Sequence, residues 1–564
     1  MTVNSLPSNN LPSLLDHYFL ESPERVAIYL IQSQRSDQSI TYRNLLDRSF
    51  AYAQSLRIAG VHEGDVAILI LNHGQELIYA FFGSILAGVI PSIMPFLTEK
   101  LDPEHYRQSL TALFEVTRPS VVISGPEFIT EINRARAHSP NPPNILLTTE
   151  IPQDGPYTPD ELPKLRSNPD EIVLLQHSSG TTGLQKGVAL SHRAVLNQLD
   201  SYSQAIHLTD SDVIVSWLPL YHDMGLIAGF LLPVLCCVPL VLMSPFDWVR
   251  APYRLFQAVS QYRGTLAWLP NFAYNFCAQK VRPREMENVD LSSWRAAINC
   301  SEPMHWKSHQ VFLDRFTSYG FSPSALATSY AMAENVFAVT QGGISQAVQV
   351  DMVNQSLLIS EQLAVPATDE SSAVRMLSAG RPISGTQVRV IDPEGRDLPE
   401  RSIGEIAINS NCMLTGYYNR PDLDDSTFKD GWYLTGDLGY LAAGELYITG
   451  RKKDLIIVGG KNIYPQDVER LAGEVKGVHP GRVVAFGVYN ETIGTEEVVV
   501  VAEVDDQVPL ERQRIGDEIR QRVTRGSDIA LRYVHIVGRS WLLKTSSGKI
   551  ARLANRDKYI QETR

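Results

Sequence analysis

Hydrophobic and polar residues alternate along residues 12–170 in blocks that predict helices and strands in turn. Residues 42–59 and 76–87 repeat apolar side chains with a helical period, and a glycine follows each block. Residues 65–71 and 89–94 are short apolar runs, typical of buried strands. Strands that alternate with helices of this length predict a parallel sheet covered on both faces.

After residue 450 the pattern becomes that of a small α+β domain. The predicted elements are a helix from Pro465 to Gly473, strands at 483–488, 497–504 and 531–537, and a helix at 510–523. The sequence therefore predicts an α/β protein of two domains, residues 1–450 and residues 451–564.

One apolar stretch, residues 225–243, invites comparison with a membrane span. Its length lies at the lower limit for spanning, and Pro233, Pro239 and two glycines interrupt it. A buried helix to about Leu235, followed by a buried strand, explains the pattern better. A transmembrane segment is the less favoured alternative.

Two other stretches suggest connections. Residues 139–170 are rich in proline and polar side chains, which predicts a surface connection. Between Glu334 and Gly380 lie roughly 45 residues, a long link by ordinary standards. Residues 347–359 and 374–377 could form short strands in that link, and the alternative is a surface elaboration without a role.

Composition narrows the class of protein. With 564 residues and 44% apolar side chains, the chain can form large cores. A net charge of −12 makes nucleic acid or an anionic membrane an unexpected partner. Five cysteines, an odd number, indicate a reduced, cytoplasmic protein, and the first residues lack the pattern of a signal peptide.

The stretch EIVLLQHSSGTTGLQKGVALSH, residues 171–192, joins a predicted strand to a polar loop. Glycines let the backbone approach a polyphosphate, hydroxyls add hydrogen-bond donors, and a lysine supplies charge. The Walker pattern G-x-x-x-x-G-K-[ST] does not occur in the chain. The alternative is a flexible Ser/Gly turn between two strands.

The motif SSGTTGLQKG resembles the signature loop of the acyl-adenylate-forming superfamily, which includes acyl-CoA synthetases, luciferases and peptide-synthetase adenylation domains. The resemblance covers about residues 12–555. It implies a large domain of stacked α/β subdomains with a β-rich subdomain, and a small mobile α+β domain after it. The residues implied to hold the phosphates of ATP are Ser178, Ser179, Gly180, Thr181, Thr182, Gly183 and Lys186, with Thr182 also near Mg²⁺.

The segment WLPLYHDMG, residues 217–225, resembles the motif of fatty-acid-activating members, in which the histidine lines the route to the carboxylate. His222 is the matching residue. The absence of an aspartate that grips an α-amine argues against an α-amino acid substrate. The alternative is a turn in which the His222–Asp223 pair caps the next helix.

Two further segments resemble the family's adenine site. In TSYAMAEN, residues 328–335, the resemblance implies that Tyr330 packs on adenine beside Ala331 and Met332, and that Glu334 holds Mg²⁺ as an oxygen ligand. The family usually has glycine at Ala331 and threonine at Ala333, and an alanine at the latter position is typical of fatty acyl-AMP ligases. Taken locally, Glu334 could simply cap a helix.

The remaining implied site residues lie in other segments. Residues 299–303 resemble the strand and loop that lie along the edge of adenine in this family. The site residues implied in this segment are Ser301 and Glu302. Asp437 would accept both ribose hydroxyls. Arg451 would lie near the ribose and phosphate, Lys453 would be the pivot, and Lys549 in KTSSGK would contact the carboxylate and α-phosphate. Taken locally, Asp437 could be an ordinary turn residue. The charged side chains of Arg451, Lys453 and Lys549 could simply be solvated at the surface.

The resemblance predicts an ATP-dependent enzyme that converts a carboxylic acid, expected to be a fatty acid, into acyl-AMP with Mg²⁺. The long link after Glu334, where fatty acyl-AMP ligases carry an insertion thought to restrain domain movement, favours transfer to an acyl carrier protein. The motif at residues 459–462 instead resembles acyl-CoA synthetases, which transfer to coenzyme A. A silent binding protein is the third alternative, disfavoured by the retained lysines and carboxylates.

Overall fold

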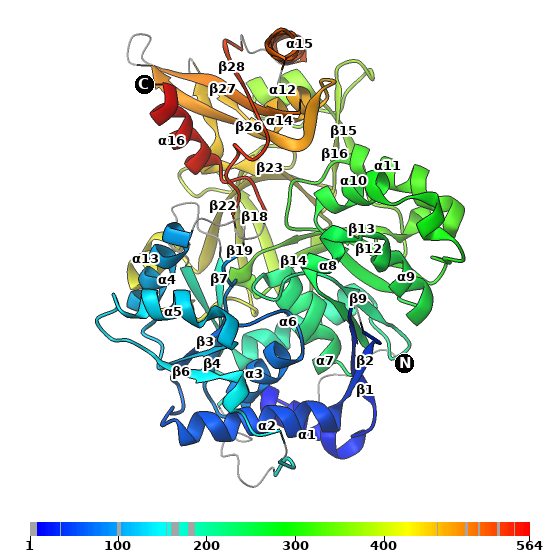
Figure 1. Ribbon diagram of the computed structural model, residues 1–564. Coiled ribbons are helices and arrows are strands. Elements are labelled where there is room, and N and C mark those ends of the chain that lie inside the picture. The colour runs from blue at the N-terminus through cyan, green and yellow to red at the C-terminus, as the bar shows by residue number, and fades with distance from the viewer. Residues whose placement is uncertain are drawn as a thin grey trace. The chain divides into compact units, whose positions relative to one another are not determined.

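A computed structural model describes residues 8–33, 35–98, 103–153, 155–158, 168–178, 186–458, 461–490, 495–505, 508–526, 531–545 and 548–563 (Figure 1). The chain divides into two compact units. Unit 1 comprises Met1–Val348, Gly380–Gln387 and Asn409–Gly431, and unit 2 comprises Gln349–Ala379, Val388–Ile408 and Trp432–Arg564. Each unit is described on its own.

The larger sheet of unit 1 has nine strands in the order β17-β14-β13-β12-β11-β9-β10-β1-β2. From β1 to β13 neighbouring strands are parallel, and the antiparallel partners β2, β14 and β17 lie at the two edges. Its strands are β1 (Val26–Ile31), β2 (Gln38–Thr41), β9 (Ile214–Ser216), β10 (Leu240–Met243), β11 (Leu266–Leu269), β12 (Ala296–Asn299), β13 (Leu326–Ala331), β14 (Ala338–Gly342) and β17 (Arg381–Pro382).

Two smaller sheets also belong to unit 1. Four parallel strands form the order β4-β3-β5-β6, and an antiparallel sheet has the order β20-β8-β7. Their bounds are β3 (Val66–Ile70), β4 (Ile90–Ile93), β5 (Val121–Ser124), β6 (Asn144–Leu147), β7 (Ile172–Ser178), β8 (Lys186–Ser191) and β20 (Gly416–Tyr417). One core joins both sheets, since Leu175 and Ala189 pack with Val66 and Val122.

Helices connect these strands, as parallel pairing requires. The longer helices of unit 1 are α1 (Leu11–Glu21), α2 (Tyr42–Ile58), α3 (Gln75–Leu86), α4 (Pro103–Thr117), α5 (Ile129–Arg136), α6 (His192–Ala205), α9 (Tyr253–Tyr262), α10 (Asn271–Lys280) and α11 (Trp306–Phe316). The shorter ones are α7 (Leu232–Leu235), α8 (Pro245–Arg250) and α13 (Pro421–Thr427), besides the π-helix η5 (Met224–Leu231).

Local sequence explains why the predicted elements appear where they do. The Thr41 side chain accepts a hydrogen bond from the Asn44 backbone and forms a capping box that starts α2. The helix ends before Gly60, whose φ of +76° is open to glycine at little cost. The predicted helices at 42–59 and 76–87 and strands at 65–71 and 89–94 are confirmed within two residues.

One prediction in unit 1 is wrong and another is confirmed. Residues 139–170 are not only a connection, because β6 pairs in parallel with β5 as the fourth strand of its sheet. The apolar stretch 225–243 is a buried helix to Leu235 followed by the buried strand β10, as predicted. Throughout the described ranges, every helix is too short or too polar to cross a membrane.

Unit 2 contains a β-rich part built on two long antiparallel strands, β22 (Trp432–Ala442) and β23 (Glu445–Arg451). Strand β19 (Gly404–Ser410) pairs with β22, and β18 (Thr386–Ile391) lies beyond it. The long link predicted after Glu334 forms a hairpin of β15 (Val350–Asn354) and β16 (Ala373–Leu377). Here the prediction for residues 347–359 is half wrong, since Asn354 caps the helix α12 (Gln355–Ser360).

The C-terminal part of unit 2, from residue 452 onward, is the small α+β arrangement that the sequence predicts. Its sheet has the order β26-β27-β28, formed by Val478–Asn490, Thr495–Val504 and Tyr533–Val537. The other elements are η10 (Lys452–Asp454), β24 (Ile456–Val458), β25 (Lys461–Ile463), α14 (Pro465–Gly473), α15 (Pro509–Gly526) and α16 (Arg552–Thr563). One face of the sheet packs on α14 and α15 through Val468, Leu471, Ile515 and Ile519.

The two compact units and the two predicted domains are different divisions of the chain. Unit 2 groups the β15–β16 hairpin and the strands β22 and β23 with the C-terminal residues. Such a grouping reflects packing, whereas the predicted boundary at residue 451 concerns motion. The hinge at residues 451–453 stays a prediction.

Candidate active site

The predicted phosphate loop begins and ends on paired strands. Ser178 is the last residue of β7, Lys186 is the first residue of β8, and the two are partners in the antiparallel register. Lys186 therefore belongs to a strand rather than to the loop in which the sequence placed it. The predicted residues Ser179, Gly180, Thr181, Thr182 and Gly183, and the side chain of Ser178, lie outside the described residues.

Lys186 and Glu334 both contact one tyrosine, Tyr417. The Lys186 Nζ atom is 5.0 Å from the centroid of the Tyr417 ring, within cation–π range. The Tyr417 hydroxyl donates a 2.9 Å hydrogen bond to Glu334 Oε1. Tyr417 reaches this place because β20 pairs with β8, opposite Val188. The structure thus brings together the predicted phosphate-binding lysine and the predicted metal ligand, through a residue that the sequence did not reveal.

The backbone beside Glu334 is strained. Val336 has φ of +60° and ψ of −54°, and the Phe337 amide donates to the Asn335 carbonyl at 2.6 Å, which defines a γ-turn. A β-branched residue in this conformation is an outlier that surrounding contacts must hold. Packing can hold this conformation here, because Val336 and Phe337 are both fully buried. Strain of this kind clusters at functional sites, and here it sets the direction of the segment that carries Glu334.

The predicted adenine residues follow two neighbouring parallel strands. Tyr330 and Ala331 end β13, and Met332 comes next, with its amide donating to the Phe337 carbonyl at 2.9 Å. Ser301 and Glu302 lie in the loop that follows β12, which pairs in parallel with β13. The carboxyl ends of parallel strands meet at one edge of a sheet, where ligands of α/β proteins usually bind.

Ser301 also lies next to the predicted carboxylate route. Its hydroxyl is 3.7 Å from the sulfur of Met224, and its φ is +68°. Met224 belongs to the segment of His222, so the loop after β12 and this segment lie in contact. The Glu302 carboxylate accepts a 2.9 Å hydrogen bond from the Phe272 amide, which fixes its own loop to the start of α10.

His222 lies in a tight turn after β9. Its Nδ1 is 4.0 Å from Asp223 Oδ1, while the Asp223 carboxylate caps η5 through the Met224 amide at 2.8 Å. The capping alternative is thus confirmed for Asp223, and the role of His222 stays a prediction. Gly225 is required here, because a Cβ would lie 2.2 Å from the Pro219 carbonyl oxygen. The π-helix that follows is a form often found at functional sites.

The predicted ribose and phosphate residues of unit 2 are partners across one strand pair. Asp437 on β22 faces Arg451 on β23, and Arg451 Nε is 2.9 Å from Asp437 Oδ1. Only 5% of Asp437 is exposed, so this carboxylate is held in one position. Glu405, which the sequence did not single out, accepts from the Gly436 amide and from Lys452 Nζ at 2.7 Å. It joins the turn before Asp437 to the predicted hinge.

The two lysines predicted for movement and catalysis also lie in unit 2. Lys453 is the middle residue of η10 and is exposed. Lys549 lies in a loop whose ends pair through Lys544 and Ile550. The site residues therefore fall into two sets, one in each unit.

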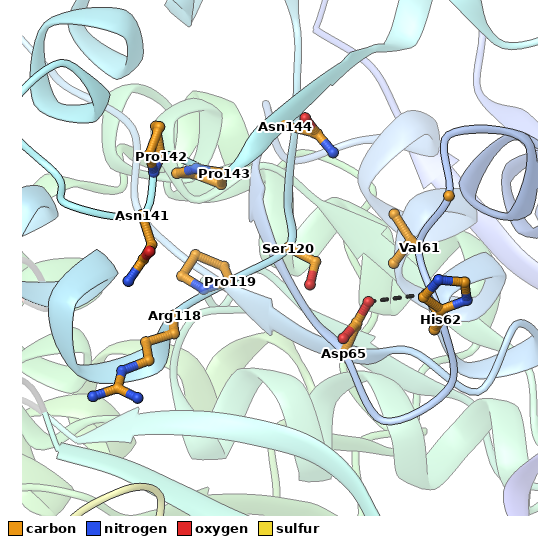
Figure 2. Close-up of a pocket in the computed structure, with 11 residues that line it drawn as sticks. Val61, His62, Asp65, Arg118, Pro119, Ser120, Asn141, Pro142, Pro143 and Asn144 are labelled. Atoms are coloured by element: carbon orange, nitrogen blue, oxygen red, sulfur yellow. Dashed lines mark hydrogen bonds between the residues drawn. The ribbon is translucent and has the colours of Figure 1, made fainter.

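A cavity of about 520 Å³ lies away from these residues (Figure 2). It opens at the amino ends of β3, β5 and β6, between the segments 60–65, 118–120 and 141–144. Figure 2 shows Asp65 beside His62, whose amide donates to the Asp65 carboxylate at 2.9 Å. None of the predicted site residues lines this cavity. Because ligands bind at the carboxyl ends of parallel strands, we do not assign it to the active site.

Comparison with known proteins identifies the family. A model of the AMP-binding enzyme family matches residues 15–418. The chain is 31% identical to the medium-chain-fatty-acid–[acyl-carrier-protein] ligase JamA of Moorena producens, over 97% of this chain and 94% of that protein. The chain belongs to the AMP-binding enzyme family.

One further relative and two solved structures are also similar to this AMP-binding enzyme. The long-chain-fatty-acid–AMP ligase FadD26 of Mycobacterium bovis is 28% identical over 98% of this chain and 97% of its own. A solved structure from a study of fatty acyl-adenylate ligases of E. coli and L. pneumophila superposes with a TM-score of 0.89, at 27% identity and 99% coverage of both chains. The L. pneumophila ligase in complex with acyl adenylate and pyrophosphate gives 0.74, at 26% identity and coverage of 99% and 97%.

These comparisons confirm the predicted superfamily, the α/β fold and the prediction of an enzyme that uses ATP. The roles of the individual site residues, of Mg²⁺ and of the acyl acceptor stay predictions. Within the described part of the chain, no group of three or more His, Cys, Asp and Glu side chains could hold a metal by itself. A Mg²⁺ ion would fit at Glu334, with phosphate oxygens as its other ligands. The Tyr417 hydroxyl donates to only one of the two carboxylate oxygens of Glu334.

Proposed function

We propose that this AMP-binding enzyme activates a fatty acid with ATP and transfers it to the phosphopantetheine thiol of an acyl carrier protein. In the first step a carboxylate oxygen bonds to the α-phosphorus and pyrophosphate leaves, which gives acyl-AMP. In the second step the thiol sulfur bonds to the acyl carbon, AMP leaves and the thiol proton passes to solvent. The relative JamA is named a fatty-acid–[acyl-carrier-protein] ligase, and the relative FadD26 is named a fatty-acid–AMP ligase.

For the first step, the Lys186–Tyr417–Glu334 cluster is the observation that supports the proposal most directly. A carboxylate and a triphosphate repel each other, so catalysis must neutralise and align them. Lys186 would face the leaving phosphates, and Glu334 would hold Mg²⁺, which when bound shields the phosphate charge. The substrate carboxylate is already ionised at neutral pH, so no general base is needed. His222 and the adenine residues would line the path of the acid and nucleotide.

For the second step, the inserted hairpin supports a carrier protein as acceptor. Asp351 on β15 accepts hydrogen bonds from Arg401 at 3.0 Å and from the Tyr440 hydroxyl at 2.9 Å. Ser378, just after β16, donates to the buried Glu445 at 2.6 Å. The hairpin is therefore fixed at both ends to the β-rich part of unit 2, which a surface elaboration without a role would not require.

The same hairpin also contacts residues beyond the predicted hinge. Val353 and Leu358 pack in one cluster with Tyr440 and Tyr447, and Leu455 and Tyr464 belong to that cluster. Residues on both sides of the segment 451–453 thus share a core with the insertion. An insertion that restrains rotation at the hinge is what the resemblance to fatty acyl-AMP ligases predicts.

The test offers the enzyme ATP, Mg²⁺ and a panel of acids, with either coenzyme A or a holo-acyl carrier protein, and identifies the products by mass. We expect acyl-AMP to accumulate with coenzyme A present and acyl-carrier protein to form when the carrier is supplied. Efficient formation of acyl-CoA would establish the acyl-CoA synthetase, which the glycines at 459 and 460 favour. Absence of acid-dependent exchange of labelled pyrophosphate into ATP would indicate a silent binding protein.

A further inference from the structure

Arg552, the first residue of α16, carries a charge that is largely buried. Its side chain is 17% exposed, and each of its three nitrogens has a partner. Nε donates to the Ala485 carbonyl at 2.9 Å, Nη1 to Asp454 Oδ2 at 2.5 Å, and Nη2 to both oxygens of Glu469 at 2.8 and 3.1 Å. A planar guanidinium can serve three separate partners, whereas the single ammonium of a lysine cannot cover them in the same geometry.

The partners of Arg552 come from three different elements. Asp454 ends η10 and directly follows Lys453, Glu469 lies on α14, and Ala485 lies on β26. Strand β26 is one edge of its sheet, and among the described residues its outward backbone groups have no strand to pair with. The Ala485 amide donates a hydrogen bond to the Glu469 carboxylate at 2.9 Å, and the Ala485 carbonyl accepts one from Arg552. The ion pair therefore completes the edge strand as well as joining three elements.

The loop that carries Lys549 is fixed to α16 at its base. The Thr545 amide donates to the Lys549 carbonyl at 2.8 Å, and the Ala551 amide donates to the Leu543 carbonyl at 3.0 Å. Asn555, fully buried near the start of α16, accepts from the Leu543 amide at 2.8 Å and donates to its carbonyl at 2.9 Å. The loop is thus bound to α16, and α16 is bound through Arg552 to the residue after Lys453.

From this geometry we propose that Arg552 is a positioning residue that holds the Lys549 loop and the hinge segment at Asp454 together as one rigid body. Rotation at Lys453 would then deliver Lys549 to a fixed place. The proposal goes beyond the proposed function and depends on it only for the catalytic role of Lys549. Misplacement of a catalytic group by about 1 Å can cost about 10²-fold in rate, so a coupling of this kind has a measurable consequence.

Electrostatics explain why the coupling depends on the charge of Arg552. Burial raises the pKa of the Glu469 carboxyl, and the nearby Arg552 opposes that shift. Without the guanidinium, Glu469 and Asp454 would lie close together with their charges uncompensated. Glu469, whose pKa burial raises, would take up a proton or turn to solvent, and either change releases α16 from the hinge segment.

The first test uses Arg552→Gln and Arg552→Lys in the full-length protein, each also combined with Lys549→Ala. The matched control is Arg556→Gln, on the next turn of α16, where the guanidinium makes only an exposed ion pair with Asp557. For acid-dependent pyrophosphate exchange we expect kcat to fall about 10- to 10²-fold in the Arg552 variants, with KM for ATP unchanged. In the Lys549→Ala background the same substitutions should cause no further loss. An equal loss in both backgrounds would mean a merely structural role and overturn the proposal.

The second test is independent of activity. Amide hydrogen exchange should become faster at residues 453–456 and 543–551 in Arg552→Gln than in the wild type and in Arg556→Gln. Unchanged exchange at residues 543–551 would refute the coupling. If the wild type shows no pyrophosphate exchange with any acid, the proposed function fails, and hydrogen exchange alone decides the coupling. If Arg552→Gln does not fold, Arg552→Lys and Asp454→Asn serve in both tests.

Discussion

Replacement of Tyr417 by phenylalanine separates the two contacts that this residue makes. The phenylalanine keeps the ring beneath Lys186 Nζ and removes the hydroxyl that donates to Glu334 at 2.9 Å. Glu334 Oε1 then loses the donor that fixes its side chain. The backbone pairing of β20 with β8 is unaffected, because it involves only main-chain atoms.

The size of the effect follows from the type of hydrogen bond. A hydrogen bond to a charged group contributes about 1.5–3 kcal/mol, which corresponds to about 10- to 10²-fold in rate if the contact matters only when Glu334 holds Mg²⁺. Replacement by leucine also removes the buried ring beneath Lys186, and the loss of this cation–π contact costs about 0.5–2 kcal/mol more. We therefore expect activity to fall in the order wild type, Tyr417→Phe, Tyr417→Leu.

The assay is acid-dependent exchange of labelled pyrophosphate into ATP, measured over a range of Mg²⁺ concentrations. In Tyr417→Phe we expect kcat/KM to fall and half-maximal activity to require more Mg²⁺. The adjacent Tyr418→Phe is the control, since Tyr418 is tied to β8 by its backbone amide, which donates to the Gly187 carbonyl. Wild-type rates and Mg²⁺ dependence in Tyr417→Phe would refute a shared role for Tyr417 and Glu334.

The remaining predictions concern Lys549 and Lys453. Lys549→Ala should lower acyl-AMP formation by about 10²–10³-fold, because one preorganised contact to the developing charge is lost, while transfer from pre-made acyl-AMP continues. Both half-reactions are measured on one sample, and an equal loss in both would mean that Lys549 is structural. Lys453→Pro, which fixes φ, should leave adenylation largely intact and slow transfer to the carrier protein. Two unchanged half-reactions would argue against rotation at this residue.

Local sequence determined those parts of the fold whose causes lie within a few residues. The capping box of Thr41 with Asn44, Pro465 at the start of α14, and the long apolar runs each define an element without help from distant residues. The motifs likewise indicated the family, because a phosphate loop and its lysine are continuous in the chain. For these features the interacting atoms are neighbours in sequence.

Tertiary structure decided the features whose partners are far apart in the chain. Tyr417 and Glu334 are separated by 83 residues, and only the pairing of β20 with β8 brings the tyrosine to its place. Strand β6 forms in a proline-rich stretch because β5 offers it a parallel partner, which local propensity cannot indicate.

The coupling of Arg552 to Asp454 has the same origin. An arginine three residues after Lys549 looks like an ordinary surface charge in the sequence. The folded chain places it between the predicted hinge segment, a helix and an edge strand, where burial makes its pairing obligatory. Sequence thus predicted which residues would carry the chemistry, and packing alone decided which residues contact them, because burial and long-range pairing exist only in the folded state.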